Sequence, residues 1–472
     1  MRIAVIGAGY VGLTTAATLA YLGHQVSCVD TDPHKINMLH GGKAPFYEPG
    51  LNELLVMTAD NLDFTTGYTQ ALQGARAVFL AVGTPPLASG APDLSQYWDA
   101  VDMVVEYAKN SAASVLLVTK STVPVGTGSK LYKRLVLQGL NFHIIVGSNP
   151  EFLRQGSALS DSFFPDRLVL GGNDEAQEIF SQIYAPMLAE PGLAAPDFLT
   201  PPWYHGIPLV YRVDLRTAEL SKYAANAFLA MKISFINEMG NIAELVGADI
   251  RQVADVIGAD PRIGRLFLNA GIGYGGSCFP KDTRALKYMA DVRGYDVTLL
   301  SAVINVNNQQ PYRLVSKLNQ ALGGLEEKVV CILGLTFKPG TDDLREAPSI
   351  PIIHTLVDAG ACVRVHDPVA PASAQSLLPP QVIYCSDVEA ALSGSDALAI
   401  LTEWSLYQAL DPLRVKELMR GDVVIDGRNC LDPQLFSRHL RYWGMGQGAD
   451  SPAELKSSVI ANRFATAGQE IR

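Results

Sequence analysis

The segment GGSCFPKD, residues 275–282, places a thiol beside two charged side chains. Cys278 follows a glycine-rich run, and Lys281 and Asp282 come shortly after it. Pro280 is typical of the first turn of a helix, so the sulfur is predicted just before a helix N-terminus. The helix dipole and a nearby ammonium group both favour the thiolate, which is the nucleophilic form of cysteine. We therefore expect Cys278 to be a nucleophile rather than part of a core.

The other five cysteines show no pattern of metal or redox chemistry. No CxxC pair occurs in the chain, so neither a structural zinc site nor a redox dithiol is indicated, and no metal is expected. Cys28, Cys331 and Cys362 lie in apolar, β-branched runs that read as buried strands, where cysteine acts as a small apolar residue. In a reducing compartment all six are expected to be free thiols.

The N-terminal segment RIAVIGAGYVG carries the glycine pattern of a dinucleotide site. Gly7, Gly9 and Gly12 follow an apolar strand and open a helical pattern, and Asp30 ends the next strand. Such glycines permit a tight turn and let backbone amides approach a pyrophosphate. The Asp30 carboxylate would accept a hydrogen bond from a ribose 2′-hydroxyl and repel a 2′-phosphate. NAD is therefore favoured over NADP, although Lys35 weakens that preference.

An NAD site combined with a nucleophilic thiol has a specific chemical meaning. Loss of a hydride from an alcohol gives an aldehyde, and a thiol that adds to it makes a thiohemiacetal. Loss of a second hydride leaves a thioester that water cleaves, so an alcohol becomes an acid and two NAD are consumed. The alternatives are a two-electron hydroxyacid dehydrogenase and a catalytically silent NAD-binding sensor or scaffold. The count of NADH per substrate separates these readings.

Two further polar groups are ambiguous from the residues alone. Lys222 and Asn226 are four residues apart and share one face of a predicted helix, which by itself favours a solvated polar stripe. Asp282 is equally explained as an ordinary acid in the first turn of a helix.

The elements that must position these residues predict an α/β protein. Short apolar strands alternate with helical patterns in two segments, which implies parallel sheets covered by helices. Between them, residues 214–247 form one long helical pattern of about 1.5 Å rise per residue, long enough to connect two domains and offer a face to a second subunit. The strand candidates are RIAVIG, QVSCVD, ARAVFLAV, SVLLVTKS and FHIIVGSN in the first segment, and KVVCILGL, CVRVHD, VIYCSD, ALAILTE and DVVIDGRN in the second. A helix is predicted at 349–358.

Composition excludes some partners. The chain has 472 residues, of which 48% are apolar, and 47 acids against 37 lysines and arginines give a formal charge of -10. That charge argues against nucleic acid or an anionic membrane as the main partner. The N-terminus lacks a leading apolar h-region, and no apolar run approaches a membrane span. A cytoplasmic location is therefore expected.

Six motifs in order resemble the UDP-glucose/GDP-mannose dehydrogenase family. They are GAGYVG, STVPVG, NPEFLRQG, AELSKYAANAFLAMKISFINE, GIGYGGSCFPKD and GLTFKPGTDDLRE, and the resemblance covers about residues 1–440. It implies two Rossmann-like doubly wound domains joined by a central helical dimerisation region, with the active site in the cleft between them, and a homodimer. The implied bounds are 1–200 for the NAD domain, 201–322 for the central region, 323–442 for the UDP-sugar domain and 443–472 for a mobile tail.

The resemblance also implies a role for each catalytic residue. Cys278 would be the nucleophile, and Lys222 and Asp282 would assist proton transfers and stabilise the oxyanion. Asn226 would hold the sugar or a water, and Glu151 would position or activate the hydrolytic water, with Thr122 nearby. A buried cation stabilises a neighbouring oxyanion far more than a cation on a solvated surface does. The resemblance therefore replaces the interpretation of Lys222 as part of a solvated polar stripe.

Ligand-binding residues follow from the same resemblance. For NAD they are Gly7, Gly9, Tyr10, Val11, Gly12, Asp30, Lys35, Thr84, Thr122, Gln155, Lys281 and Arg345. For the sugar nucleotide they are Glu151, Phe152, Leu153, Arg154, Gln155, Lys222, Asn226, Arg262, Phe267, Leu268, Asn269, Ala270, Gly271, Gly275, Phe337, Lys338 and Arg428. Arg262 resembles an arginine that reaches the partner subunit's substrate.

At one position this chain departs from the family pattern. Many relatives have a carboxylate where this chain has Gln155, and an amide cannot serve as a base there.

The segment SKYAANAFLAMKISFINE is closer to members that oxidise UDP-glucose, so UDP-glucose is the expected substrate. GDP-mannose and UDP-N-acetylhexosamines are the alternatives.

Overall fold

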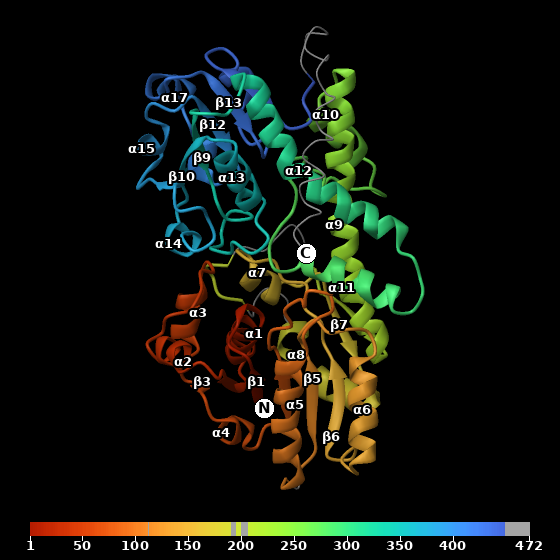
Figure 1. Cartoon of the computed structure of the whole chain (residues 1–472). Helices are drawn as coiled ribbons and strands as arrows, with labels where there is room; N and C mark the ends of the chain where they lie inside the picture. Colours follow the sequence, from red (N-terminus) through yellow and green to blue (C-terminus); the bar gives the residue numbers. More distant parts are fainter. Residues whose placement is uncertain (112, 190–194, 200–205, 449–472) are drawn as a thin grey trace. The chain divides into compact units, whose positions relative to one another are not determined.

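The computed structural model describes residues 1–111, 113–189, 195–199 and 206–448, which form two compact units. Each unit contains one sheet with helices around it, which confirms the predicted α/β class with two parallel-sheet domains (Figure 1). Unit 1 comprises Met1–Phe228, Cys278–Thr298 and Pro339–Asp342. Unit 2 comprises Leu229–Ser277, Leu299–Lys338 and the described residues from Asp343 onward.

The sheet of unit 1 has the strand order β3-β2-β1-β4-β5-β6-β7-β8. Its pairs are parallel except β6 with β7, which is antiparallel. The order reverses between β1 and β4, the switch point at which such sheets bind nucleotides. The strands are β1 (Arg2–Ile6), β2 (Gln25–Val29), β3 (Leu62–Thr65), β4 (Ala77–Leu80), β5 (Val115–Thr119), β6 (Ile144–Ser148), β7 (Arg167–Gly171) and β8 (Leu209–Val213).

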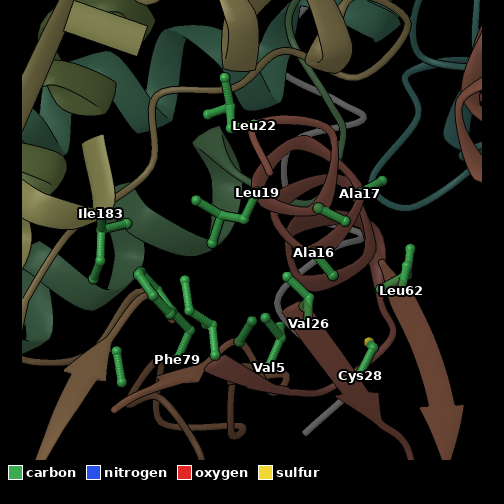
Figure 2. Packing of buried hydrophobic residues seen from close by; sticks show 14 of the residues in the cluster. Val5, Ala16, Ala17, Leu19, Leu22, Val26, Cys28, Leu62, Phe79 and Ile183 are labelled. Carbon is green, nitrogen blue, oxygen red and sulfur yellow. The ribbon is translucent and has the colours of Figure 1, made fainter. Parts of the chain in front are cut away.

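Alternation along β1 builds two core layers, one on each face of this sheet. Ile3 and Val5 belong to the layer that includes helix α1, and Ala4 and Ile6 to the layer that includes α5 and α6. Figure 2 shows side chains of α1, among them Leu19, beside strand residues of the first layer. The helices of unit 1 are α1 (Tyr10–Tyr21), α2 (Pro33–His40), α3 (Leu51–Met57), α4 (Tyr68–Leu72), α5 (Ser95–Lys109), α6 (Thr127–Leu137), α7 (Ala158–Phe163), α8 (Asp174–Ala189) and α11 (Phe279–Asp291).

Helix α9 (Leu215–Val246) is the long helix that the sequence predicts, and it contributes residues to both units. Its 32 residues contain no proline, so the backbone hydrogen bonds continue without a break. Lys222 and Asn226 lie on the part of α9 that belongs to unit 1, and their side chains are buried. The reading of these residues as a solvated stripe is therefore wrong.

The sheet of unit 2 repeats the order of the first six strands of unit 1. Its order is β11-β10-β9-β12-β13-β14, and all pairs are parallel. The strands are β9 (Val329–Leu333), β10 (Cys362–His366), β11 (Ile383–Tyr384), β12 (Ala397–Ile400), β13 (Val423–Asp426) and β14 (Arg441–Gly444). The helices are α10 (Ile250–Gly258), α12 (Thr298–Leu322), α13 (Ser349–Asp358), α14 (Pro371–Ala374), α15 (Val388–Leu392), α16 (Ser405–Gln408), α17 (Pro412–Leu418) and α18 (Pro433–Phe436).

The structure adds four strands to the ten predicted. Strands β3, β7, β8 and β14 were not predicted, and β14 extends past residue 442, where the tail was expected to begin. Strand β3 has only four residues, although three of them are buried, and all but the last side chain of β8 are exposed, so β8 lacks the buried pattern of a core strand. Residues 449–472 of the predicted tail, and 200–205 of the predicted proline-rich connection, lie outside the described residues.

Candidate active site

The turn after β1 has the geometry of a dinucleotide site. Gly7 has φ +104°, and a Cβ there would lie 2.7 Å from the carbonyl oxygen of Ala81. A Cβ at Gly12 would lie 1.8 Å from the carbonyl oxygen of Gly7. These two glycines are therefore required by the fold of the turn itself.

Gly9 is different, and its surroundings fit the pyrophosphate of NAD. Apart from its neighbours in the chain, no protein atom lies within 4 Å of where its Cβ would be, so packing does not require a glycine there. Gly9 is the N-cap of α1, and no side chain caps that helix. The backbone N–H groups of the first turn lie at the positive end of the helix dipole, where an anion binds well.

Asp30 closes the same turn from the end of β2. Its Oδ2 accepts a hydrogen bond of 2.9 Å from the N–H of Ala8, and its Oδ1 accepts one of 3.0 Å from the N–H of Asp32. The ammonium group of Lys35 lies 3.5 Å from Asp30 Oδ2. The carboxylate is thus fixed beside the glycine turn, and Lys35 neutralises part of its charge.

Cys278 is the N-cap of α11 and is half-buried. Pro280 occupies the first turn of this helix, as the sequence predicts, and Asp282 N–H donates to the carbonyl of Cys278 at 2.8 Å. Cys28 and Cys331, by contrast, are fully buried in strands β2 and β9, and burial raises the pKa of both thiols. Cys362, Cys385 and Cys430 are half-buried like Cys278, so Cys362 is not the fully buried residue that its strand pattern predicts. What distinguishes Cys278 is its place at the N-terminus of α11.

Lys222 and Glu151 form an ion pair in the interior of unit 1. Lys222 Nζ lies 2.7 Å from Glu151 Oε1, and the side chains are only 4% and 6% exposed. Burial lowers the pKa of Lys222, whereas the nearby charge of Glu151 raises it. Cys278 and Asp282 raise that pKa as well, and the net shift is upward. The charged form of Lys222 is therefore favoured, and the predicted nucleophile is close enough to contribute to that effect.

Asp282 and Asn226 form a second buried contact beside the first. Asn226 Nδ2 donates to Asp282 Oδ2 at 2.6 Å, and Asp282 is 1% exposed. Lys281 pairs with the other carboxylate oxygen of Asp282. The residues Lys222, Asn226, Glu151, Asp282 and Cys278 thus come from three regions of the sequence and meet in one part of unit 1.

The segment after β6 is held by contacts at both ends. Glu151 Oε2 accepts a hydrogen bond of 2.6 Å from the N–H of Leu153. Arg154 is engaged by Asp161, with its backbone N–H and its guanidinium both donating to that carboxylate. The aromatic ring of Phe152 lies under the guanidinium of Arg167, whose central carbon is 3.8 Å from the ring centroid. Arg154, which the resemblance predicts to contact substrate, thus forms an ion pair with Asp161 within unit 1.

Glu48 fixes the end of this segment, and sequence reasoning did not find it. Its Oε2 accepts from Gly156 N–H at 2.6 Å, and its Oε1 accepts from Ala158 N–H at 2.7 Å. Gly156 N–H also donates to the hydroxyl of Tyr10 at 2.7 Å, which ties the segment to the glycine turn. Thr84 Oγ1 donates to the carbonyl of Thr122 at 2.9 Å, so these two predicted cofactor residues lie side by side.

In unit 2 the loop that precedes Cys278 is held by side-chain amides. Gly271 N–H donates to Asn237 Oδ1 at 2.8 Å, and Gln310 Nε2 donates to the Gly271 carbonyl at 3.1 Å. Asn307 of α12 accepts from Tyr274 N–H at 2.8 Å and donates to the Tyr274 carbonyl at 3.1 Å. Asn307 and Gln310 lie outside the sequence motifs, and Asn237 lies within one but was given no role, because each amide acts on backbone far away in the chain.

Arg428 joins the same set of contacts in unit 2. Its guanidinium donates to the carbonyls of Leu401, Gly273 and Phe337 at 2.8, 3.0 and 3.0 Å. These bonds support a role in holding backbone, in place of or beside the predicted contact with sugar. Gly275 and Gly276 pack tightly, since a Cβ at Gly275 would lie 2.3 Å from the Glu346 carbonyl.

The remaining predicted ligand residues of unit 2 differ in exposure. The Arg262 side chain is 88% exposed and pairs with Asp260 at 2.6 Å. Arg345, predicted to bind NAD, is 64% exposed and pairs with Asp343 at 2.6 Å. Within the loop Phe267–Gly271, Phe267 has φ +65°, Leu268 and Ala270 are buried, and Asn269 is exposed and accepts from Arg265. The ammonium group of Lys338 lies 5.7 Å from the ring centroid of Phe337.

The predicted residues thus separate by unit. The catalytic set and the NAD set lie in unit 1, except Arg345, and most of the sugar-nucleotide set lies in unit 2. Among the described residues, no cluster of His, Cys, Asp and Glu is arranged to hold a metal ion. No helix in the described ranges combines the length and the apolar character needed to cross a bilayer.

Comparison with known proteins gives matches along most of the chain. Models of the UDP-glucose/GDP-mannose dehydrogenase family match in order, with the NAD binding domain at residues 1–188, the central domain at 216–309 and the UDP binding domain at 331–433. The UDP-glucose 6-dehydrogenase YwqF of Bacillus subtilis (strain 168) is 45% identical over 460 residues, 96% of this chain and 99% of the relative.

Solved structures agree with these matches. A UDP-glucose dehydrogenase from the hyperthermophilic archaeon Pyrobaculum islandicum superimposes with a TM-score of 0.84 at 38% identity, over 95% of this chain and 98% of that one. A UDP-D-ManNAc dehydrogenase from Pyrococcus horikoshii gives a TM-score of 0.80 at 25% identity, over 95% and 100%. Fold, glycine turn and matches define an NAD-dependent dehydrogenase. The chain belongs to the UDP-glucose/GDP-mannose dehydrogenase family.

Proposed function

We propose that the protein oxidises UDP-glucose to UDP-glucuronate and reduces two NAD per substrate. Relatives that are 40 to 45% identical carry the name UDP-glucose 6-dehydrogenase, which supports this substrate over other nucleotide sugars. The observation that carries the proposal is the buried polar set of Lys222, Glu151, Asn226 and Asp282 in unit 1, in which Cys278 is close enough to Lys222 to raise its pKa. A two-electron dehydrogenase has no use for that thiol.

Cys278 and Lys222 divide the covalent chemistry between them. The Cys278 sulfur adds to the aldehyde carbon and forms a thiohemiacetal, which becomes a thioester after the second hydride leaves. Because the pKa of Lys222 lies above its ordinary value, despite burial, its ammonium group is present to favour the thiolate and then the developing oxyanion. Bound NAD supplies the hydride acceptor, so one carbinol, one water and two NAD⁺ give one carboxylate, two NADH and three protons.

Glu151 is suited to hold the water that cleaves the thioester. Burial raises the pKa of its carboxyl group, but the charge and hydrogen bond of Lys222 lower it more, and the net shift is downward. Glu151 is therefore an acceptor at neutral pH, and Thr122 would lie near the water. Asn226 would bind the sugar or the water, and Asp282 would take part in proton transfer at the carbinol oxygen.

Unit 2 supplies the residues proposed for the UDP moiety. The loop Phe267–Gly271, Gly275, Phe337 and Lys338 would contact it, and the ammonium group of Lys338 would offset diphosphate charge in a chain of net negative charge. The amide contacts of Asn237, Gln310 and Asn307 support this proposal, because they fix the loop backbone before any ligand arrives.

We also propose a homodimer through α9. Phe228, Phe235 and Ile242 follow one another at intervals of seven residues and are 58%, 47% and 46% exposed. Large apolar side chains at this spacing form a stripe along one helix face, which is the pattern of a helix that packs against a partner. Light scattering of the wild type and of Phe235→Glu tests this, with a dimer and a monomer as the expected masses.

The decisive experiment counts products with purified protein. UDP-glucose should give UDP-glucuronate and two NADH, whereas GDP-mannose and UDP-N-acetylhexosamines should give little. Cys278→Ser should lose steady turnover, because a sugar ester at that position hydrolyses slowly, and Cys385→Ser should retain it. One NADH per substrate, or full turnover by Cys278→Ser, would refute the mechanism, and NADH formed from GDP-mannose alone would refute the substrate.

A further inference from the structure

Lys120 lies immediately after β5 and contacts the turn that carries Glu151. Its Nζ donates to Asn149 Oδ1 at 2.9 Å, and Asn149 N–H donates to the carbonyl of Thr119 at 2.9 Å. Asn149 is 1% exposed and stands two residues before Glu151. The ends of two neighbouring strands are thus joined by one lysine and one asparagine.

Asn149 is held from two further elements. Its Oδ1 also accepts a hydrogen bond of 2.5 Å from the Tyr184 hydroxyl of α8, and its Nδ2 donates to the carbonyl of Val169 in β7 at 3.0 Å. The amide oxygen is therefore shared by the Lys120 ammonium group and the Tyr184 hydroxyl, and the amide nitrogen is tied to β7. Lys120 is then close enough to Glu151 for its charge to lower the pKa of that carboxyl group.

We propose that Lys120 is a positioning residue for the reaction, which holds the turn 149–151 through Asn149 and so keeps Glu151 in place beside Lys222. This inference rests on the proposed function, in which Glu151 is the acceptor beside the reacting thioester. Lys120 itself touches no reacting atom in this scheme. It acts through the placement and charge of Glu151.

The pKa of Lys120 indicates that this residue serves function rather than stability. Burial lowers its pKa to about 8, with Glu151 raising it and Lys222 lowering it. The charged groups that face it are therefore Glu151, after β6, and Lys222, on α9, with the Tyr184 hydroxyl reaching the shared amide from α8. A lysine whose charged form is disfavoured by the fold is retained at a cost, and such residues concentrate at functional sites.

The test compares Lys120→Met with Lys120→Arg and with Lys133→Met, an exposed lysine on α6. Lys120→Met should lower kcat at pH 7 by roughly 10- to 100-fold, with both KM values little changed. The acid limb of its kcat profile should move to higher pH, by less than removal of Lys222 would move it, because Glu151 loses the weaker of its two neighbouring cations. Lys120→Arg should restore the acid limb, and Lys133→Met should match the wild type.

Thermal unfolding separates this role from a merely structural one. Because the fold disfavours the Lys120 charge, Lys120→Met should keep or raise Tm at pH 7 while it loses activity. A parallel fall in Tm and kcat, or a wild-type kcat and acid limb in Lys120→Met, would overturn the proposal. If the wild type oxidises a different nucleotide sugar, only the substrate assignment fails, and the variants are compared on that sugar.

A crystal structure of Lys120→Met tests the positioning without any turnover. The Asn149 amide should turn, and the contact of 2.7 Å between Glu151 Oε1 and Lys222 Nζ should lengthen. An unchanged amide and an unchanged ion pair would refute the positioning role even in a protein that oxidises no sugar at all.

Discussion

Lys222 Nζ and Glu151 Oε1 lie 2.7 Å apart in the interior of unit 1, one on helix α9 and the other after strand β6. Both side chains are almost completely buried, so water does little to screen the two charges. An ion pair of this kind is costly to build and more costly to break, because removing one partner leaves a buried charge without compensation. The pair therefore has separable consequences for stability and for catalysis.

Breaking the pair should cost more stability than removing it. Lys222→Met and Glu151→Gln should each lower the free energy of unfolding by about 3–5 kcal/mol. The double variant should be more stable than either single variant, since no charge is left unpaired, yet it should be as inactive as Lys222→Met. Denaturant unfolding and kcat of all three variants check this. Additive losses in the double variant would show that the two residues do not act as a pair.

The same pair predicts how stability depends on pH. The pKa of Glu151 is lowered by folding, so its contribution is present above its unfolded pKa of about 4.3 and is lost as pH falls through the folded value. The pKa of Lys222 is raised, so its contribution is present below about 10.4 and is lost as pH rises beyond that.

The difference in Tm between the wild type and Glu151→Gln should accordingly be constant near neutral pH and shrink below about pH 4.3. Glu106→Gln is a matched control, because Glu106 pairs with Lys109 on the surface with 69% of its side chain exposed. That control should show little difference at any pH. A difference for Glu151→Gln that persists unchanged at pH 3 would contradict the lowered pKa.

The sequence predicted the elements whose signal is local. The glycine turn, Asp30 at the end of β2, the long helix α9 and the proline in the first turn of α11 are confirmed because each is a pattern over neighbouring residues. Lys222 shows the limit of such reasoning. Its spacing from Asn226 fixes a shared helix face, but whether that face is wet or buried depends on which segments pack over it.

The contacts that hold the site could not be predicted from the sequence for the same reason. Lys120 and Asn149 are 29 residues apart, Tyr184 is 35 residues beyond Asn149, and Asn307 is 33 residues from Tyr274. Strand order brings these residues together, and the order of a parallel sheet is not written in any short motif. Only the resemblance to a family linked the distant catalytic residues before the structure did.

Gly9 and Gly12 should respond differently to the same substitution. Gly12→Ala puts a Cβ 1.8 Å from the Gly7 carbonyl oxygen, so the turn must deform and Tm should fall. Gly9→Ala meets no protein atom within 4 Å and keeps an allowed φ of -79°, so Tm without ligand should stay near the wild type. NAD affinity of Gly9→Ala should nevertheless fall by at least about tenfold, or roughly 1.4 kcal/mol.

Calorimetric titration with NAD and thermal unfolding of the apo proteins measure the two effects separately. Full NAD affinity in Gly9→Ala would mean that the pyrophosphate does not approach this turn. A large fall in the apo Tm of Gly9→Ala would mean that the open space beside Gly9 is filled in the protein in solution.

Asn307 should control the affinity for UDP without affecting NAD. Its amide makes two hydrogen bonds to the backbone of Tyr274, and that backbone continues into Gly275 of the proposed UDP site. Asn307→Asp keeps the acceptor for Tyr274 N–H but turns an oxygen toward the Tyr274 carbonyl, and Asn307→Leu loses both bonds. Each lost bond should cost about 1 kcal/mol.

Titration of UDP into the apo protein should therefore give a Kd raised about five- to tenfold in Asn307→Asp and more in Asn307→Leu. The Kd for NAD should be unchanged, because the glycine turn belongs to unit 1. Asn308→Asp, at an exposed position on the same helix, controls for the added charge. Equal losses for UDP and NAD would indicate a general loosening of the fold, and unchanged UDP binding would show that the loop keeps its shape without the amide.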